Sequence, residues 1–241
     1  MFNSLVQYAG TFWGKCGGEK ERTGSAGNAQ PSPAAEADRP LKEVDFVVFD
    51  TELTGLKAGK DSIVSIGAVK MRGERILLGE TFYRVALPRT TLTAKTVLIH
   101  EITPTEAAEA PGMDTLLPEL LDFLGDAVIV GHVVSIDLQF LNREMKEQYG
   151  KSKTLQNPAL DTYRLYQWIS EKEDDRCAYH GGSPESADLF TLAKKYRIPV
   201  QRAHNALGDA FITAQLFQRL LHTLPRWGVN TVKDLLRIGS P

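Results

Sequence analysis

The stretch FVVFDTELTGL, residues 46–56, decides the fold that we expect for this chain. Its four leading apolar residues are typical of a strand covered on both faces, and Thr54 and Gly55 then end it. Side chains two apart in a strand point to the same side, so Asp50 and Glu52 emerge together at its carboxyl end. Two like charges at a poorly hydrated strand end favour a bound cation, whereas a strand that ends in solvent would leave both carboxylates hydrated.

Composition places the chain among ordinary globular proteins. It has 241 residues, of which 42% are hydrophobic and 24% charged, enough for one substantial domain. The formal net charge of −2 provides no bulk positive field, so a polyanion would need a local basic patch or bound metal. Two distant cysteines, Cys16 and Cys177, exclude a disulfide framework and a Cys-rich zinc site. Because apolar runs are far shorter than the roughly 18 residues of a membrane span, we expect a cytoplasmic protein without membrane contact.

Four segments follow from the distribution of residue types. Residues 1–16 carry an apolar stripe at helical spacing, which predicts an amphipathic helix that docks on its own domain, a second copy of the chain or another partner protein. Residues 17–43 are rich in Gly, Ser, Ala, Pro and charge, as in a flexible linker. The main domain spans residues 44–224, and residues 225–241 form a short carboxyl-terminal extension.

The main domain has the pattern of an α/β layer structure. Two strands follow the first in a meander, and a further buried strand comes later, at residues 62–70, 76–85 and 127–132. Helical spacing of apolar residues marks residues 113–124, 136–149, 162–171, 186–196 and 206–224, and a last helix at 230–238 has Asn230 as its expected N-cap. Three strands followed by alternating helices and a strand predict a sheet flanked by helices.

Asp137 is a candidate partner for the two acids of the first strand. Ser135 can cap the helix that contains it, and a first-turn acid is favoured by the helix dipole whatever the function. The helix begins just after the strand at 127–132, however, so Asp137 also lies at the carboxyl edge of the sheet. If the two strands run parallel, Asp50 and Glu52 lie at that same edge, where open α/β sheets bind ligands.

His204 and Asp209 form a second candidate pair. Positions five apart on a helix are separated by about 140°, so both serve one site only if His204 precedes the helix and Asn205 caps it. The alternative is an ordinary loop histidine and an ordinary first-turn acid. His100, expected in a loop after the third strand, is as a lone histidine more often packed or solvated than a ligand. Asp161 is expected to be a plain N-cap.

These residues lie in motifs that resemble those of a known family. FDTELTGL, GHVVSIDLQFL and HNALGDA match, in order, the three motifs of the DEDDh-type 3′-to-5′ exonucleases, the family of the proofreading epsilon subunit of bacterial DNA polymerase III. LIHEIT, DTYRLY and LFTLAKKYRIP match further stretches, so the resemblance covers about residues 44–224. The chain departs from the pattern where Leu53, Glu101, Val133 and Ile136 replace the usual Thr, Gly, Asn and Phe. These departures affect the nucleotide pocket and spare the acids and the histidine.

The resemblance implies a ribonuclease H-like fold, with a mixed five-stranded sheet flanked by helices. It also implies phosphodiester hydrolysis that releases mononucleotides from a 3′ end. Four carboxylates can hold two divalent ions, and oxygen ligands favour Mg²⁺ or Mn²⁺. The implied catalytic residues are these metal ligands and the general base, namely Asp50, Glu52, Asp137, Asp209 and His204. The implied substrate-binding residues, which would line the terminal nucleotide, are Leu53, Thr54, Leu56, Ile99, His100 and Ile136.

Several hypotheses follow for the function. The first is a metal-dependent exonuclease on single-stranded or frayed DNA, and a close variant acts on RNA or short oligoribonucleotides, since recognition of the 2′-hydroxyl depends on pocket shape. A non-catalytic nucleic-acid-binding module is the alternative, against which the intact acids and histidine argue. The short tail after Leu224 favours a stand-alone or otherwise tethered enzyme over a replicative proofreader.

Overall fold

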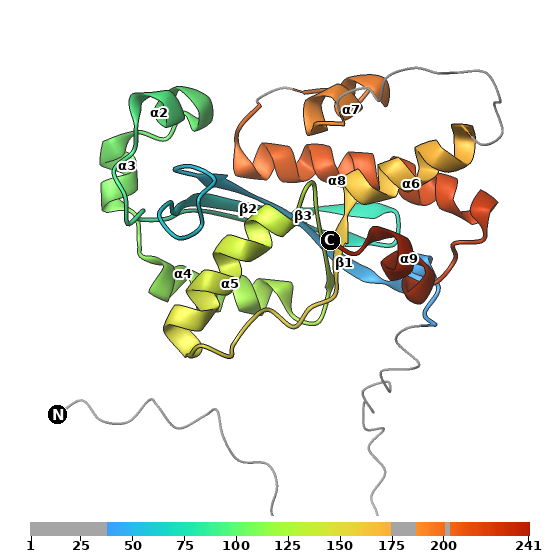
Figure 1. Cartoon of the computed structure of the whole chain (residues 1–241), viewed down its shortest axis with the longest axis horizontal. Helices are drawn as coiled ribbons and strands as arrows, with labels where there is room; N and C mark the ends of the chain where they lie inside the picture. The colour runs from blue at the N-terminus through green and yellow to red at the C-terminus, as the bar shows by residue number, and fades with distance from the viewer. Residues whose placement is uncertain (1–37, 175–186, 201–202) are drawn as a thin grey trace, which may run out of the picture. The chain divides into compact units, whose positions relative to one another are not determined.

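The structure is a computed structural model that describes residues 38–174, 187–200 and 203–241 (Figure 1). The helix predicted at 1–16 and most of the linker predicted at 17–43 lie outside the described residues. Of the linker, residues 38–43 are described and include a short 3₁₀ helix, η1 (Leu41–Glu43). In the described part of the chain, no helix is both long and apolar enough to cross a bilayer.

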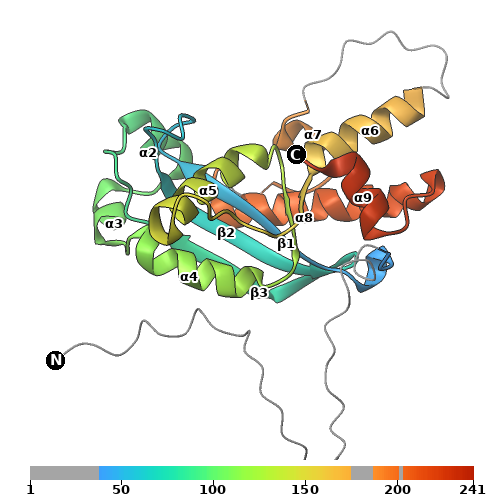
Figure 2. The same cartoon turned by 60° about the horizontal axis from the view of Figure 1, so that its bottom comes forward.

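The centre of the fold is a mixed five-stranded sheet, as the family resemblance implies. Its strand order is β3-β2-β1-β4-β5; the first three strands pair antiparallel, and β4 and β5 run parallel to β1. Figure 2 shows β1, β2 and β3 lying alongside one another. The strand bounds are β1 (Asp45–Leu53), β2 (Ile63–Arg72), β3 (Arg75–Val85), β4 (Val128–Gly131) and β5 (Ala159–Asp161). Sequence reading missed β5, which at three residues is too short for a periodic pattern.

Helices cover both faces of the sheet, with α4 and α5 on one side and α6, α7 and α8 on the other (Figure 1). Six helices agree with the predicted ranges to within a few residues: α4 (Met113–Leu124), α5 (Ser135–Tyr149), α6 (Thr162–Asp174), α7 (Leu189–Lys195), α8 (Ala206–Thr223) and α9 (Val232–Gly239). Two short helices follow β3 where a loop was expected, α2 (Ala94–His100) and α3 (Pro104–Glu109). His100 is therefore the last residue of a helix, which Thr93 caps at its start and which ends at the left-handed Glu101.

Two predicted helix caps are wrong by one residue. Ser135 is the first helical residue of α5, because Val134 already has helical angles and makes no side-chain cap. At α9 the cap is Thr231 instead of Asn230. The Thr231 side chain accepts a hydrogen bond from the backbone of Asp234, whose carboxylate accepts the Thr231 backbone N–H at 3.2 Å, and this reciprocal pair fixes the start.

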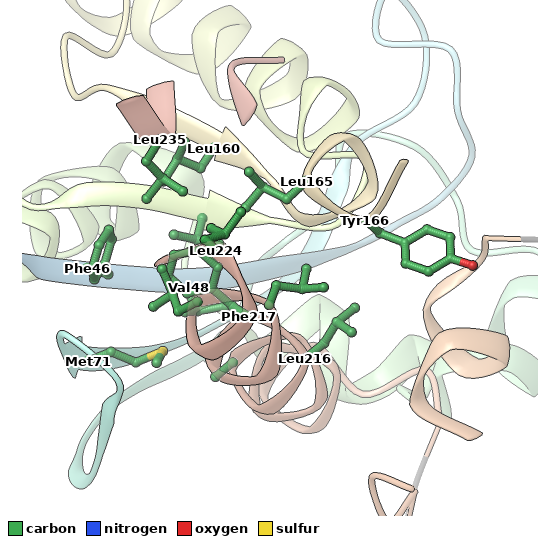
Figure 3. Packing of buried hydrophobic residues seen from close by; sticks show 14 of the residues in the cluster. Phe46, Val48, Met71, Leu160, Leu165, Tyr166, Leu216, Phe217, Leu224 and Leu235 are labelled. Atoms are coloured by element: carbon green, nitrogen blue, oxygen red, sulfur yellow. The ribbon is translucent and has the colours of Figure 1, made fainter. Parts of the chain in front are cut away.

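The alternation of β1 explains its unbroken apolar run. Phe46 and Val48 pack in the layer with α6, α7, α8 and α9, whereas Val47 and Phe49 pack in the layer with α4 and α5. Figure 3 shows residues of the first layer, among them Phe46 and Phe217. Their rings pack edge-on, with centroids 5.0 Å apart. A strand buried on both faces is rigid, so its carboxyl end is a fixed platform for functional side chains.

Residues after 224 contribute to the same core. The 3₁₀ helix η2 (Leu224–Trp227) continues α8, and α9 follows it. Val232 and Leu235 of α9 are buried in the layer that contains α6 and α8. The apolar face of α9 is therefore buried within the described part of the chain.

Candidate active site

Three carboxylates from two distant parts of the chain meet at the carboxyl end of β1. Asp50 and Glu52 project from the strand toward α8, and Asp209 lies in the first turn of that helix. One oxygen of each lies within 4.8 Å of the others. The structure therefore brings Asp209 to the two acids of β1, as the functional interpretation of the sequence expects.

Asp137 joins this edge of the sheet from the opposite layer. It lies in the first turn of α5, which follows β4, and β4 runs parallel to β1 as the prediction requires. Its side chain is 6% exposed and accepts hydrogen bonds from the backbone N–H and the hydroxyl of Thr51, at 3.1 and 2.5 Å. Thr51 lies between Asp50 and Glu52 but points to the other face, so it fixes Asp137 beside them. Sequence reasoning missed Thr51; a hydroxyl residue between two acids was the available signal.

His204 precedes α8 as predicted, and Asn205 caps the helix by accepting the Gly208 N–H at 3.0 Å. The backbone N–H of His204 donates to Asp209 Oδ2 at 3.0 Å. The imidazole is exposed, and it contacts the Phe190 ring edge-on at 5.1 Å. His204 is thus tied to the acid cluster through its backbone, while its ring stays free to approach a substrate from solvent.

Burial raises the pKa of all four acids, and repulsion from neighbouring acids of the cluster adds to the rise at Asp50 and Glu52. Burial is the larger cause at Glu52, where the nearby Asp209 and Asp137 charges add to it, and the pKa is about 8. Burial raises the pKa of Asp137 to about 7, although the Thr51 hydrogen bonds oppose the rise. The pKa of Asp209 rises to about 6, also by burial. The pKa of Asp50 is well above its ordinary value through burial and the charges of its three neighbours.

The cluster fits a divalent cation. Asp209 Oδ1 is buried and has no hydrogen-bond partner among the described residues, a cost that a bound cation would remove. The available donors are all carboxylate oxygens. Such a set suits hard cations such as Mg²⁺ and Mn²⁺ better than Zn²⁺ or Cu²⁺. Clustered carboxylates whose pKa values are raised by burial hold a cation in place of the protons they would otherwise bind.

We expect the stabilisation by Mg²⁺ or Mn²⁺ to increase with pH. Because the folded pKa values lie above the unfolded values near 4, the metal-free fold loses stability as pH rises from about 4 to about 8. A bound cation removes this loss. Thermal unfolding should therefore show a metal-induced rise of about 5–10 °C at pH 8 and a much smaller one at pH 5.5. NaCl at matched ionic strength is the control, and equal rises at both pH values would contradict the expectation.

The predicted nucleotide pocket is only partly accessible. Leu56 and Ile99 are 72% and 38% exposed, whereas Thr54 and His100 are buried. Leu53 and Ile136 are half-buried and pack against the layer of α4 and α5. A hollow of about 420 Å³ lies beside His204 and is lined by Tyr83, His100, Glu101, Ile102, Glu106, Ala203, His204 and Asn205. The roles of all these residues toward a nucleotide stay predictions.

Backbone strain gathers around this edge. Among the described residues, positive φ occurs at four non-glycine positions, and three of them, Glu101, Val133 and His204, flank the acids or the hollow. A β-branched residue such as Val133 rarely adopts φ of 55°, and each such residue costs about 1–3 kcal/mol. Glu101 and Val133 are two of the positions where the chain departs from the motif pattern of Gly and Asn, residue types that adopt positive φ more readily.

The chain also matches known proteins. Residues 47–217 match the family model described as exonuclease (RNase_T). A DNA polymerase III subunit epsilon-like protein of Rhodobacter capsulatus is 35% identical over 204 residues, which is 84% of this chain and 27% of that protein. DNA polymerase III PolC-type of Bacillus subtilis is 31% identical over 83% of this chain and 13% of its own length. This chain thus spans about a quarter or less of these relatives.

Solved structures share the fold. Exonuclease X in complex with 5′ overhanging duplex DNA superposes with a TM-score of 0.60 at 22% identity, over 80% of this chain and 98% of that one. The E. coli ExoI–ssDNA complex in its zinc-bound form superposes with a TM-score of 0.65 at 20% identity, over 76% of this chain and 42% of that one.

Proposed function

This chain belongs to the exonuclease family whose model it matches, and from this premise we propose that it removes nucleotides from the 3′ end of single-stranded or frayed DNA. The observation that carries the proposal is the meeting of Asp50, Glu52 and Asp209 within 4.8 Å, with Asp137 locked onto the intervening Thr51. A partly buried group of like charges is costly to fold and is typical of a functional site.

The four acids are proposed to hold two divalent ions, Mg²⁺ or Mn²⁺. Asp50 would contact both ions, Glu52 and Asp209 would complete the first site, and Asp137 would serve the second. When bound, the ions would supply charge stabilisation for an attacking water and for the leaving oxygen. The contribution of Thr51 is to orient Asp137, since a ligand held by two hydrogen bonds needs little rearrangement to bind.

His204 is proposed to be the general base. Its imidazole would accept a proton from water as the water oxygen bonds to phosphorus and the bond from phosphorus to the 3′ oxygen of the preceding nucleotide breaks. The released product is a nucleoside monophosphate, and the shortened strand keeps a 3′ hydroxyl. Asp209 accepts the His204 backbone N–H, so a single carboxylate both anchors the backbone of the proposed base and faces the metal site.

The charge of the chain supports an end-specific substrate. A protein that coats a duplex needs many lysines and arginines, whereas this chain has 28 basic and 30 acidic residues. Binding one or a few terminal nucleotides through bound metal ions requires no basic surface. We favour DNA over RNA because the curated relatives are named as DNA polymerase III proteins.

Digestion of end-labelled oligonucleotides tests the proposal. With Mg²⁺ or Mn²⁺, 5′-labelled single-stranded DNA should shorten stepwise from the 3′ end, faster than RNA of the same sequence. A blunt duplex should resist, and EDTA should stop the reaction because it removes the ions. Failure to shorten DNA and RNA alike would reject the enzymatic proposal and leave the non-catalytic binding module. Faster RNA digestion would reassign the substrate.

A further inference from the structure

The loop between β1 and β2 is held in shape by its own hydrogen bonds. It covers residues 54–62, and its ends are joined by Thr54 N–H to the Ser62 carbonyl at 2.9 Å and by Ser62 N–H to Thr54 Oγ1 at 2.9 Å. Inside it, the Asp61 carboxylate accepts the Lys57 N–H at 2.8 Å. A Cβ at Gly55 would lie 2.5 Å from Asp61 Oδ2, so a larger residue here would displace the Asp61 carboxylate that closes the loop. The loop begins two residues after Glu52 and exposes Leu56.

Arg143 of α5 fastens this loop to the helix that carries Asp137. Its Nη1 donates to the backbone carbonyls of Ala58 and Asp61, the latter at 2.6 Å. Arg143 lies six residues after Asp137, or about 9 Å along the helix axis. Helix α5 is therefore joined to β1 and its loop at two separated points, the first through Asp137 and Thr51 and the second through Arg143.

A buried carboxylate holds the Arg143 side chain in place. Glu144 is 1% exposed, and its two oxygens accept from Arg143 Nη2 at 2.8 Å and Arg89 Nη2 at 2.5 Å. Arg89 also donates its backbone N–H to Ser62 Oγ at 3.1 Å, so it too contacts the loop. Breaking a buried pair leaves an uncompensated charge, unlike the loss of a surface pair. Glu144 has no place in the proposed chemistry, which makes a positioning role the natural explanation for it.

We propose that Arg143 is a positioning residue whose anchored loop, residues 54–62, sets the affinity of the site for the nucleic-acid end. This rests on the proposed exonuclease function for its substrate, although the anchoring itself can be measured without activity. With the loop fastened to α5, the exposed Leu56, which is expected to bind substrate, is held in one place before substrate arrives, so no ordering cost is added to binding. The acids do not depend on Arg143 for their hydrogen bonds, so the chemical step should be affected little.

Arg143→Lys is the informative change. A lysine keeps a positive charge beside Glu144 but lacks the planar fork that reaches two carbonyls and a carboxylate together. Lys57 and Lys60 are exposed trypsin sites inside the loop, so brief trypsin digestion followed by mass spectrometry reports loop release directly. We expect cleavage after these lysines to become about tenfold faster, KM for a single-stranded oligonucleotide to rise about tenfold, and kcat to stay within threefold. The metal-induced rise in melting temperature should be unchanged.

Arg72→Lys is the matched control, because Arg72 pairs with Asp45 at the other end of β1 in an exposed ion pair. It should leave loop cleavage and KM unchanged. The proposal is overturned if trypsin cleaves the loop of the Arg143→Lys variant at the same rate as in the unchanged protein, or if kcat falls while KM stays constant. Should Arg143→Lys not fold, Arg89→Lys replaces it: it keeps the Arg89 backbone bond to the loop but weakens the hold on Glu144, which binds Arg143. Smaller rises in loop cleavage and KM are then expected, and their absence overturns the proposal. If the unchanged protein is inactive, the proposed function is rejected. The role of Arg143 is then tested by the rate of loop cleavage and by the affinity for the oligonucleotide.

Discussion

Asp50→Asn should lower exonuclease activity by about 10³-fold or more, the largest effect of any single substitution in the site. Asparagine has the same shape but lacks the negative charge, so in the proposed two-ion arrangement the ions would lose their common ligand. Without metal at pH 8, the same change should raise the melting temperature, because the pKa of Asp50 is raised by burial and by three neighbouring acids. Loss of activity together with a gain in stability separates a functional residue from a structural one.

The control for this change is Asp45→Asn on the same strand. Asp45 is exposed and pairs with Arg72 Nη1 at 3.0 Å, so its loss should leave activity unchanged and alter stability only slightly. Oligonucleotide digestion and thermal unfolding with and without Mg²⁺ measure both variants. Activity retained in Asp50→Asn, or a lower melting temperature in metal-free buffer, would show that Asp50 is not the acid on which the site depends.

The first strand explains why so much of this site could be predicted from sequence. Its apolar run, its breaker residues and the two-residue spacing of Asp50 and Glu52 are local features, and strand geometry converts them directly into a shared direction. Asp209 and His204 were likewise fixed by one local inference, that Asn205 caps the helix, and the structure confirms this cap. Parallel β1 and β4 then place Asp137 at the same edge.

What the sequence could not reveal depends on contacts between distant residues. Thr51 and Asp137 are 86 positions apart, and Arg143 reaches carbonyls 82 and 85 positions away. Backbone carbonyls carry no sequence signature, so an arginine that binds them looks like any surface arginine. Short elements were missed for a related reason, since α2 and α3 span too few turns to establish a period.

Gly67 shows how a residue without a side chain positions the site. In the antiparallel sheet it lies opposite Asp50 on one side and Tyr83 on the other, so all three face the layer of α8. The first turn of α8 presses onto the sheet at this point, and a Cβ on Gly67 would lie 2.1 Å from the backbone nitrogen of Leu207. Asp209 reaches Asp50 only because this contact is between backbones.

Gly67→Ala should therefore lower both stability and activity. The methyl group meets backbone atoms, which cannot move aside as a flexible side chain can, so α8 must shift from the sheet at a cost of about 3 kcal/mol or more. The melting temperature should fall by about 6–12 °C. The same shift carries Asp209 and His204 away from Asp50, and a displacement near 1 Å costs about 10²-fold in rate. Gly79→Ala on β3 is the control, because its Cβ would meet nothing within 4 Å. If both alanine variants unfold at the same temperature and digest DNA equally, then α8 is not held by this contact and another feature must place Asp209.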